Sequence, residues 1–160
     1  HLDGHWHCHQ NPFVLAMVLE MGKAQGLKAV RIPFEPWTFS RRIADEGFAP
    51  ARLAHVAGHW PLALEMRRQI RKAGMIANDR FFGKNDNGAM TEELLLGLVR
   101  HLPEGITEVG LHPATKTWPH RHAPPPHWRP EPELAGLTST RVRAEIEARG
   151  IQLCRWSDLA

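Results

Sequence analysis

The first nine residues constrain the fold more than any other stretch of the chain. His1, Asp3, His5, His7 and His9 occupy its odd positions. Odd positions share one face of an extended chain, so an extended tract would direct four imidazoles and one carboxylate into one pocket. Such side chains suit a divalent ion such as Zn²⁺, Mn²⁺ or Mg²⁺. The alternative is a solvent-exposed histidine-rich terminus, although the intervening residues distinguish it from a purification tag.

Strand-like and helix-like patterns alternate along the rest of the chain. Asn11 and Pro12 can cap and begin a helix, and the apolar run that follows to residue 25 predicts a buried one. A β-branched run at 28–32 predicts a strand. Further helices are expected at 51–73, with a break near Gly58 and Pro61, and at 91–101 and 138–149. Further strands are expected at 74–77, 106–111 and 151–155. Loops are expected at 34–50, 81–88 and 115–132. This order predicts an α/β protein with parallel strands, either an open sheet or a closed barrel.

Candidate reactive residues follow several of the predicted strands. The histidine tract ends the first, Asp79 follows the third and His112 follows the fourth. In parallel α/β folds the chemistry lies at the carboxyl ends of the strands. These residues are therefore expected on one rim. The alternative for His112 is a histidine that caps a turn or helix.

Composition narrows the class of protein. A chain of 160 residues with 42% hydrophobic and 23% charged residues is typical of one globular domain, here 1–160. The net charge of +3 comes from scattered Lys and Arg, which predicts no nucleic-acid surface, and no apolar run is long enough to predict a transmembrane helix. Cys8 and Cys154 are too few for a disulfide framework and fit a reducing, cytoplasmic compartment. The oligomeric state stays open, a homodimer being one option.

Several motifs, in order, resemble those of the YdjC-like carbohydrate deacetylases. They are His1-Leu-Asp-Gly-His5-x-His7-x-His9, Ala29-Val-Arg-Ile-Pro33, Thr107-Glu-Val-Gly-Leu-His-Pro-Ala114 and Glu133-Leu-Ala-Gly-Leu-Thr-Ser139. Phe34-Glu-Pro36 and the stretch from Gly88 to Leu96 resemble the hopanoid-biosynthesis-associated branch. The resemblance implies a distorted (β/α) barrel, of which this chain would be the carboxy-terminal portion without the first strands.

The resemblance also implies an activity and a cofactor. The family removes acetyl from an N-acetylated sugar, here a free sugar or a glycolipid such as a glycosylated hopanoid, with a divalent metal, Mg²⁺ or Zn²⁺. One aspartate and two histidines hold that metal, and the second histidine falls on His5. The aspartate and the other histidine belong to segments that this sequence lacks, so we expect this chain alone to be inactive.

Other residues receive roles from the same resemblance and from their chemistry. His112 suits the delivery of a proton to the leaving amine. Asp3 and His7 could orient His5 or contact sugar hydroxyls. Arg31 could bind substrate, with an ordinary ion pair as the alternative. Three aromatic residues are candidates for stacking on sugar faces, with core packing as the alternative for each: Trp37, Phe81 and Phe82.

Two other functions fit the sequence. Metal-dependent hydrolases of the amidohydrolase or phosphoesterase type also place His-x-His at a strand end, and His5 and His7 would serve. That function needs further ligands, for which Asp79 and His112 are the candidates. A non-enzymatic metal-binding module would instead use the histidine tract and the proline-rich segment at 115–132.

Overall fold

Short parallel segments form the centre of the structure, a computed structural model that describes residues 1–36, 50–115 and 125–159. Leu2 bridges Val30, and Ala29 bridges Ile76, both in parallel orientation. Strand β1 (Arg80–Phe82) pairs in parallel with β2 (Thr107–Val109). Four parts of the chain therefore run side by side in one direction, in the order in which they occur in the sequence.

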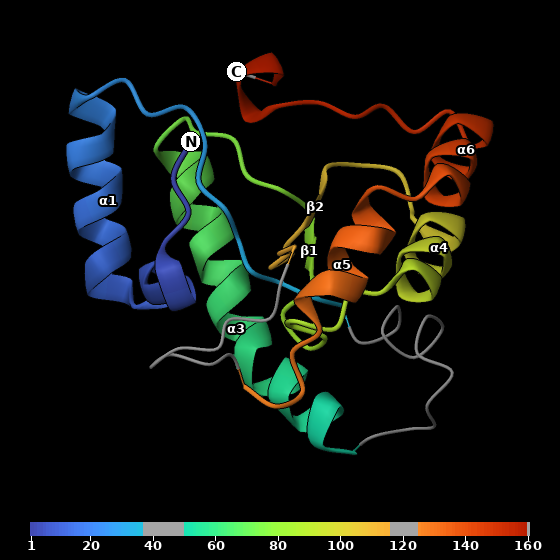
Figure 1. Cartoon of the computed structure of the whole chain (residues 1–160). Helices are drawn as coiled ribbons and strands as arrows, with labels where there is room; N and C mark the ends of the chain where they lie inside the picture. The colour runs from blue at the N-terminus through green and yellow to red at the C-terminus, as the bar shows by residue number, and fades with distance from the viewer. Residues whose placement is uncertain (37–49, 116–124, 160) are drawn as a thin grey trace.

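Helices flank these segments in two groups. Figure 1 shows α1 and α3 together beside the N-terminal segments, and α4, α5 and α6 together beyond β1 and β2. The helices are α1 (Pro12–Ala24), α3 (Pro50–Lys72), α4 (Glu92–His101), α5 (Pro130–Leu137) and α6 (Thr140–Ala148), with short 3-10 helices η1 (His5–Gln10) and η2 (Trp156–Asp158). The predicted helices at 13–25, 51–73, 91–101 and 138–149 are thus confirmed, although α3 continues through Pro61 without the expected break.

Each helix group packs against the apolar residues of the strand segments. Val30 and Ile32 join Leu15, Met66 and Ile70 in a core with α1 and α3. A second core contains residues of β1, of the loop before α4, of α4 and of α6: Phe82, Met90, Leu95, Leu96, Leu98, Val99 and Val142. Because side chains alternate along an extended segment, the residues that lie between these apolar residues of the strand segments point to the opposite face of the array. That opposite face carries polar residues.

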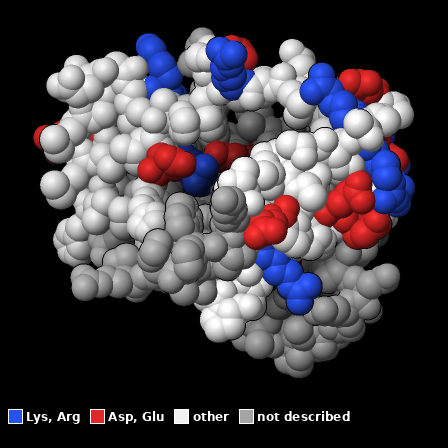
Figure 2. Space-filling model, in the orientation of Figure 1, with Lys and Arg blue, Asp and Glu red and all other residues white. Residues whose placement is uncertain are grey.

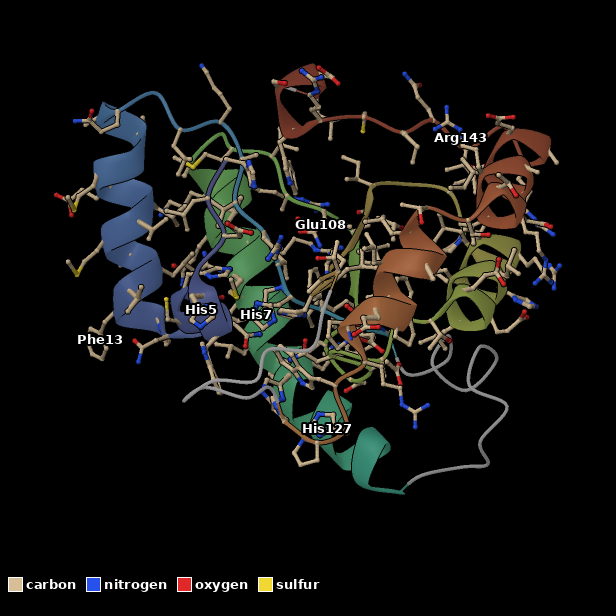
Figure 3. The ribbon with its side chains drawn as sticks, in the orientation of Figure 1. His5, His7, Phe13, Glu108, His127 and Arg143 are labelled. Carbon is tan, nitrogen blue, oxygen red and sulfur yellow. The ribbon has the colours of Figure 1, made fainter. Side chains whose placement is uncertain are left out.

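The prediction that the first helix is buried was wrong. Asn11 does cap α1, because its side chain accepts from the backbone N–H of Phe13 at 3.0 Å. Only Leu15 of α1 is buried, whereas Phe13 is 83% exposed and Met21 is 63% exposed. Phe13 projects from the outer side of the helix (Figure 3). Figure 2 shows few charged side chains over α1 on the face it displays.

Other local predictions also require correction. The histidine tract forms η1 instead of a strand, and β1 covers residues expected in a loop. The segment 151–155 forms no strand, and α5 begins inside the expected loop at 115–132. The predicted strands at 28–32 and 74–77 join the parallel array through isolated bridges and do not form full strands. With two strands in the described residues, a closed barrel is not shown. The prediction for Trp37 lies outside the described ranges.

Asn78 connects the second parallel segment to the third. This side chain is 1% exposed. Its Oδ1 accepts from the N–H of Ile32 at 2.7 Å, and its Nδ2 donates to the carbonyls of Ile32 and Arg80 at 2.8 Å each. An amide side chain can both donate and accept, as a strand backbone does. Between Ile76 and β1 the backbone leaves the hydrogen-bond ladder. The side chain of Asn78 therefore forms the hydrogen bonds that the backbone does not form there.

Replacement of Asn78 by leucine should strongly destabilise the fold. The backbone N–H of Ile32 would lose its acceptor in a dry interior, while the Ile32 carbonyl would keep only the hydrogen bond from the N–H of Phe34, at a cost of about 1–3 kcal/mol in the free energy of unfolding. Asn11→Ala, which removes only the cap of α1, should cost about 1 kcal/mol and is the control. Urea denaturation followed by circular dichroism measures both. A loss of under 1 kcal/mol for Asn78→Leu would contradict this role.

Candidate active site

The histidine tract turns sharply after the first parallel segment. Leu2 pairs with the neighbouring segment, since its N–H donates to the carbonyl of Ala29 at 2.9 Å. The chain then enters η1, where Trp6 (φ 55°) and His7 (φ 54°) adopt the left-handed conformation. Side chains larger than glycine rarely tolerate this conformation, and it is concentrated at functional sites. The tract is thus not extended beyond Gly4, so the extended conformation on which the predicted common face rested was wrong, although the rings of His7 and His9 still meet edge-on, with centroids 6.3 Å apart.

His9 secures this turn from the inside. Its side chain is fully buried. Nδ1 accepts from the N–H of Gly4 at 3.0 Å, so Nε2 carries the proton and donates to the carbonyl of Arg31 at 2.8 Å. Burial lowers the pKa of His9. Both ring nitrogens are occupied, so His9 is a structural residue and has no nitrogen available for a metal.

His7 is half-buried, and one of its ring nitrogens forms no hydrogen bond within the described residues. Its ring meets Phe81 edge-on, with centroids 5.2 Å apart. Its Nδ1 is buried and has no hydrogen-bond partner among the described residues. Burial, assisted by the positive charges of Lys84 and Arg31, lowers the pKa of His7 from 6.5 to about 4. At neutral pH His7 is therefore an uncharged imidazole, the form that binds metals and accepts hydrogen bonds.

His5 lies on the exposed side of the same turn. Its ring stands edge-on to Trp6 at 5.9 Å between centroids. Figure 3 shows His5 and His7 on η1, with His7 nearer the strands. The two histidines thus differ in kind: His5 is open to a ligand from solvent, whereas His7 faces the protein.

Arg31 joins Asp3 to Glu108 across the polar face of the array. Its guanidinium lies 2.7 Å from Asp3, forms a two-pronged hydrogen bond with Glu108 and covers the ring of Phe81 at 4.9 Å. This supports the ion-pair alternative for Arg31. Glu108 was not predicted from the sequence, although its position in the strand-like run at 106–111 places it on the face opposite its partly buried neighbours.

Possible metal ligands gather beside Arg31, but this position does not favour a cation. Ligand atoms of His1, Asp3 and Glu108 lie within 4.8 Å of one another. The Arg31 guanidinium already forms ion pairs with both carboxylates. A metal ion would have to displace it or share the carboxylates with a like charge. We therefore interpret this group as an ion-pair network.

Glu35 fixes the loop that follows β1. This carboxylate is 5% exposed. It accepts from the backbone N–H of Lys84 at 3.1 Å, and from the backbone and side chain of Asn85 at 3.2 and 2.9 Å. The loop carries the half-buried side chain of Lys84. Burial lowers the pKa of Lys84, and the negative charge of Glu35 offsets part of this decrease. A second cationic group is thus held near His7.

His112 lies three residues beyond the end of β2 and is exposed. Its ring packs against Trp128, with centroids 4.5 Å apart and planes tilted by 41°. Its backbone N–H donates to Oε2 of Glu133 at 2.5 Å. Neither Trp128 nor Glu133 was predicted as a site residue from the sequence. Trp128 lies in the proline-rich segment, where no periodicity marks it.

The predicted rim is formed in part. His5 and His7 follow the first parallel segment, Glu35 the second, Lys84 the third and His112 the fourth. No hydrogen bond or ring contact joins His5 to His112 within the described parts of the chain.

Asp79 was expected on this rim, and that expectation was wrong. It precedes β1, where its side chain accepts from the N–H of Ile106 at 2.9 Å and lies 3.8 Å from Arg67. It therefore belongs to the amino ends of the strands.

A groove in the described ranges lies at the amino ends, not at the rim. It has a volume of about 1200 Å³ and is bordered by α1, the chain from Gly26 to Ala29, and Trp156, whose ring stacks on His1. In parallel α/β folds the amino-terminal side contributes stability rather than chemistry. We therefore place the candidate site at the opposite end, around His5, His7, Lys84 and His112.

Parallel segments, flanking helices and polar groups at the carboxyl ends define the class: an α/β protein with its candidate site on the strand rim. The particular family follows from the sequence. A match to the YdjC-like protein family covers residues 1–148. The chain belongs to this family, which is of the carbohydrate-deacetylase type. No curated protein matches the chain.

A solved structure shares the fold. It is a protein of Enterococcus faecalis named a cellobiose-phosphate cleavage protein, 19% identical, with a TM-score of 0.66. The match covers 100% of this chain and 52% of that chain, so the chain spans about half the length of its structural neighbour. At this identity the likeness concerns the fold alone. No helix in the described ranges is long and apolar enough to cross a membrane.

The depressed pKa of His7 makes stability depend on pH. His7 stays neutral in the folded chain down to about pH 4, whereas the unfolded chain binds a proton near pH 6.5. The free energy of unfolding should therefore fall as the pH drops from 6.5 towards 4, by at most about 1.4 kcal/mol per pH unit from this group. His7→Phe should flatten this slope, and the control His5→Phe should not. Urea titrations at several pH values measure it, and equal slopes for all three proteins would contradict the assignment.

Proposed function

We propose that this chain supplies part of the active site of a metal-dependent deacetylase that removes acetyl from an N-acetylated sugar. The deacetylase-type family supports this class of reaction. The observation that carries the proposal is the rim itself: His5 and His112 are exposed at the carboxyl ends of the first and fourth parallel segments. We include a glycolipid such as a glycosylated hopanoid as substrate, because Phe34-Glu-Pro36 and the Gly88 to Leu96 stretch match that branch.

The donors on the rim fit a divalent ion such as Mg²⁺ or Zn²⁺. His5 is the first-rank ligand in this proposal, since its imidazole is exposed on a strained turn. The neutral His7, whose buried Nδ1 has no hydrogen-bond partner in the described ranges, supports His5 or contacts substrate in this proposal. When bound, the ion supplies Lewis-acid polarisation of the amide carbonyl. A catalytic site needs about three protein ligands, and this chain supplies one that matches the family motif.

His112 is the proposed general acid. Hydrolysis of the amide breaks the C–N bond, and the amine leaves well only when its nitrogen receives a proton. Imidazole is the side chain that most often serves as a general acid in such reactions. Neither buried carboxylate of the rim is suited to take the proton from water, because Glu35 and Glu133 are both occupied by backbone N–H groups. The general base is therefore a group other than these two.

The rival functions receive less support. A hydrolase of the amidohydrolase or phosphoesterase type needs Asp79 as a ligand together with His5 and His7. Asp79 lies at the amino ends and is engaged with Ile106. A metal-binding module built on the whole histidine tract loses His9, whose two nitrogens are occupied.

Substitution of His5 tests the metal assignment. In the polypeptide that carries the activity, His5→Ala should abolish acetate release from an N-acetylglucosaminyl substrate and weaken divalent-metal binding at least tenfold. His101→Ala, on α4, is the control because the hydrogen bond of that exposed histidine within the described residues is to Gly97 of its own helix. Enzymatic acetate assay and metal titration give the two readings. Near-normal activity and metal content in His5→Ala would refute the assignment.

Substitution of His112 separates acid catalysis from metal binding. Loss of a general acid typically lowers the rate about 10²–10⁴-fold. We expect His112→Ala and His112→Gln to reduce kcat by that factor with unchanged metal content, measured by steady-state kinetics and elemental analysis. Metal lost in step with activity would make His112 a ligand, and an unchanged kcat would make it structural.

A further inference from the structure

We propose that Glu133 is a positioning residue that holds His112 in its working orientation. This inference rests on the proposed function, in which His112 delivers the proton. Glu133 itself is fully buried, at 0% exposure, and so cannot meet a substrate. Its effect on the reaction must pass through the residues that it binds.

The contacts of Glu133 reach two separate loops. From the first half of α5, Oε2 accepts from the N–H of His112 and Oε1 accepts from the N–H of Met90 at 2.9 Å. One buried carboxylate thus joins the loop after β2 to the loop before α4. Hydrogen bonds to an ionised group are about twice as strong as neutral ones. No ion pair to Lys or Arg is found for Glu133 in the described ranges, so these N–H groups are the partners that offset its burial.

The surroundings of His112 extend this restraint from the backbone to the ring. Pro113 limits the backbone on the carboxyl side. Trp128 packs on the imidazole, and Trp128 in turn rests on Gly88 (φ 77°), where a Cβ atom would come within 2.3 Å of the indole. The N–H of Arg129 also donates to the carbonyl of Gly88. Glu133 therefore fixes the main chain of His112 while Trp128 limits its side chain.

Such a restraint matters for a proton donor more than for a packing residue. A general acid works only within hydrogen-bond reach of the departing nitrogen. A shift of about 1 Å in a reacting group can lower a rate about a hundredfold. If α5 only had to pack against its neighbours, a buried carboxylate would not be needed, because a well-packed apolar side chain of similar volume often stabilises a fold as much or more.

The first test uses Glu133→Gln in the 160-residue chain and needs no activity. Glutamine keeps the shape but offers one acceptor oxygen, so one of the two N–H groups loses its partner. We expect amide hydrogen exchange at His112 or Met90 to accelerate at least tenfold, and the nuclear Overhauser effects between the His112 and Trp128 rings to weaken. Exchange at Val30 should not change. Glu131→Gln, on the same helix but exposed, is the matched control. Unchanged exchange and ring contacts would overturn the proposal.

The second test measures kinetics in the polypeptide that carries the activity. Glu133→Gln should lower kcat at least tenfold and leave KM within twofold. In a His112→Ala background the same substitution should have no further effect on kcat, because coupled residues are not additive. A separate, multiplicative loss in that background would assign Glu133 a general structural role and overturn the proposal. If Glu133→Gln does not fold, Glu133→Asp, which keeps the charge on a shorter stem, is measured in the same cycle.

The two tests separate this inference from the proposed function. If the unmodified polypeptide releases no acetate, the deacetylase proposal fails, while hydrogen exchange and ring contacts still decide whether Glu133 orients His112. If acetate is released but Glu133→Gln leaves kcat unchanged, the function stands and the positioning role fails.

Discussion

Buried polar side chains that bind backbone groups hold this structure together. In the described ranges His9, Glu35, Asn78 and Glu133 are the buried polar or charged side chains, and each forms hydrogen bonds to the main chain of another segment. The strands are too short to satisfy all nearby backbone groups by pairing, and an unpaired buried N–H or C=O is costly. Side chains take over this task, three of them where loops leave the carboxyl ends of the array.

This arrangement divides the rim into supporting and exposed groups. His9 and His7 belong to one turn, yet the ring of His9 is bonded on both sides whereas Nδ1 of His7 has no partner in the described ranges. Glu133 is buried beneath His112, whose ring is exposed against Trp128. The left-handed backbone at Trp6 and His7 fits the same division, because local strain persists only where surrounding contacts fix it.

The sequence predicted the helices better than the strands, for physical reasons. Helices α1 and α4 carry local signals, such as the Asn11 cap and the acidic first turn of α4. The strand segments depend on distant partners, so the alternation in the histidine tract suggested a strand where a left-handed turn forms. The exposed rim residues His5 and His112 could be proposed from their place after strand-like runs. Glu108 and Glu133 could not, because their roles exist only through contacts 77 and 21 residues away.

The same reasoning explains why Asp79 and His112, which appeared equivalent in the sequence, have different roles. Each was expected directly after a strand. The third segment, however, resumes as β1 beyond Asn78, because that amide replaces the missing ladder bonds to Ile32 and Arg80. Asp79 is thereby left at the amino end of β1, bonded to Ile106. No such resumption follows β2, and the chain leaves the array at His112. One buried amide thus determines which of the two candidates reaches the rim.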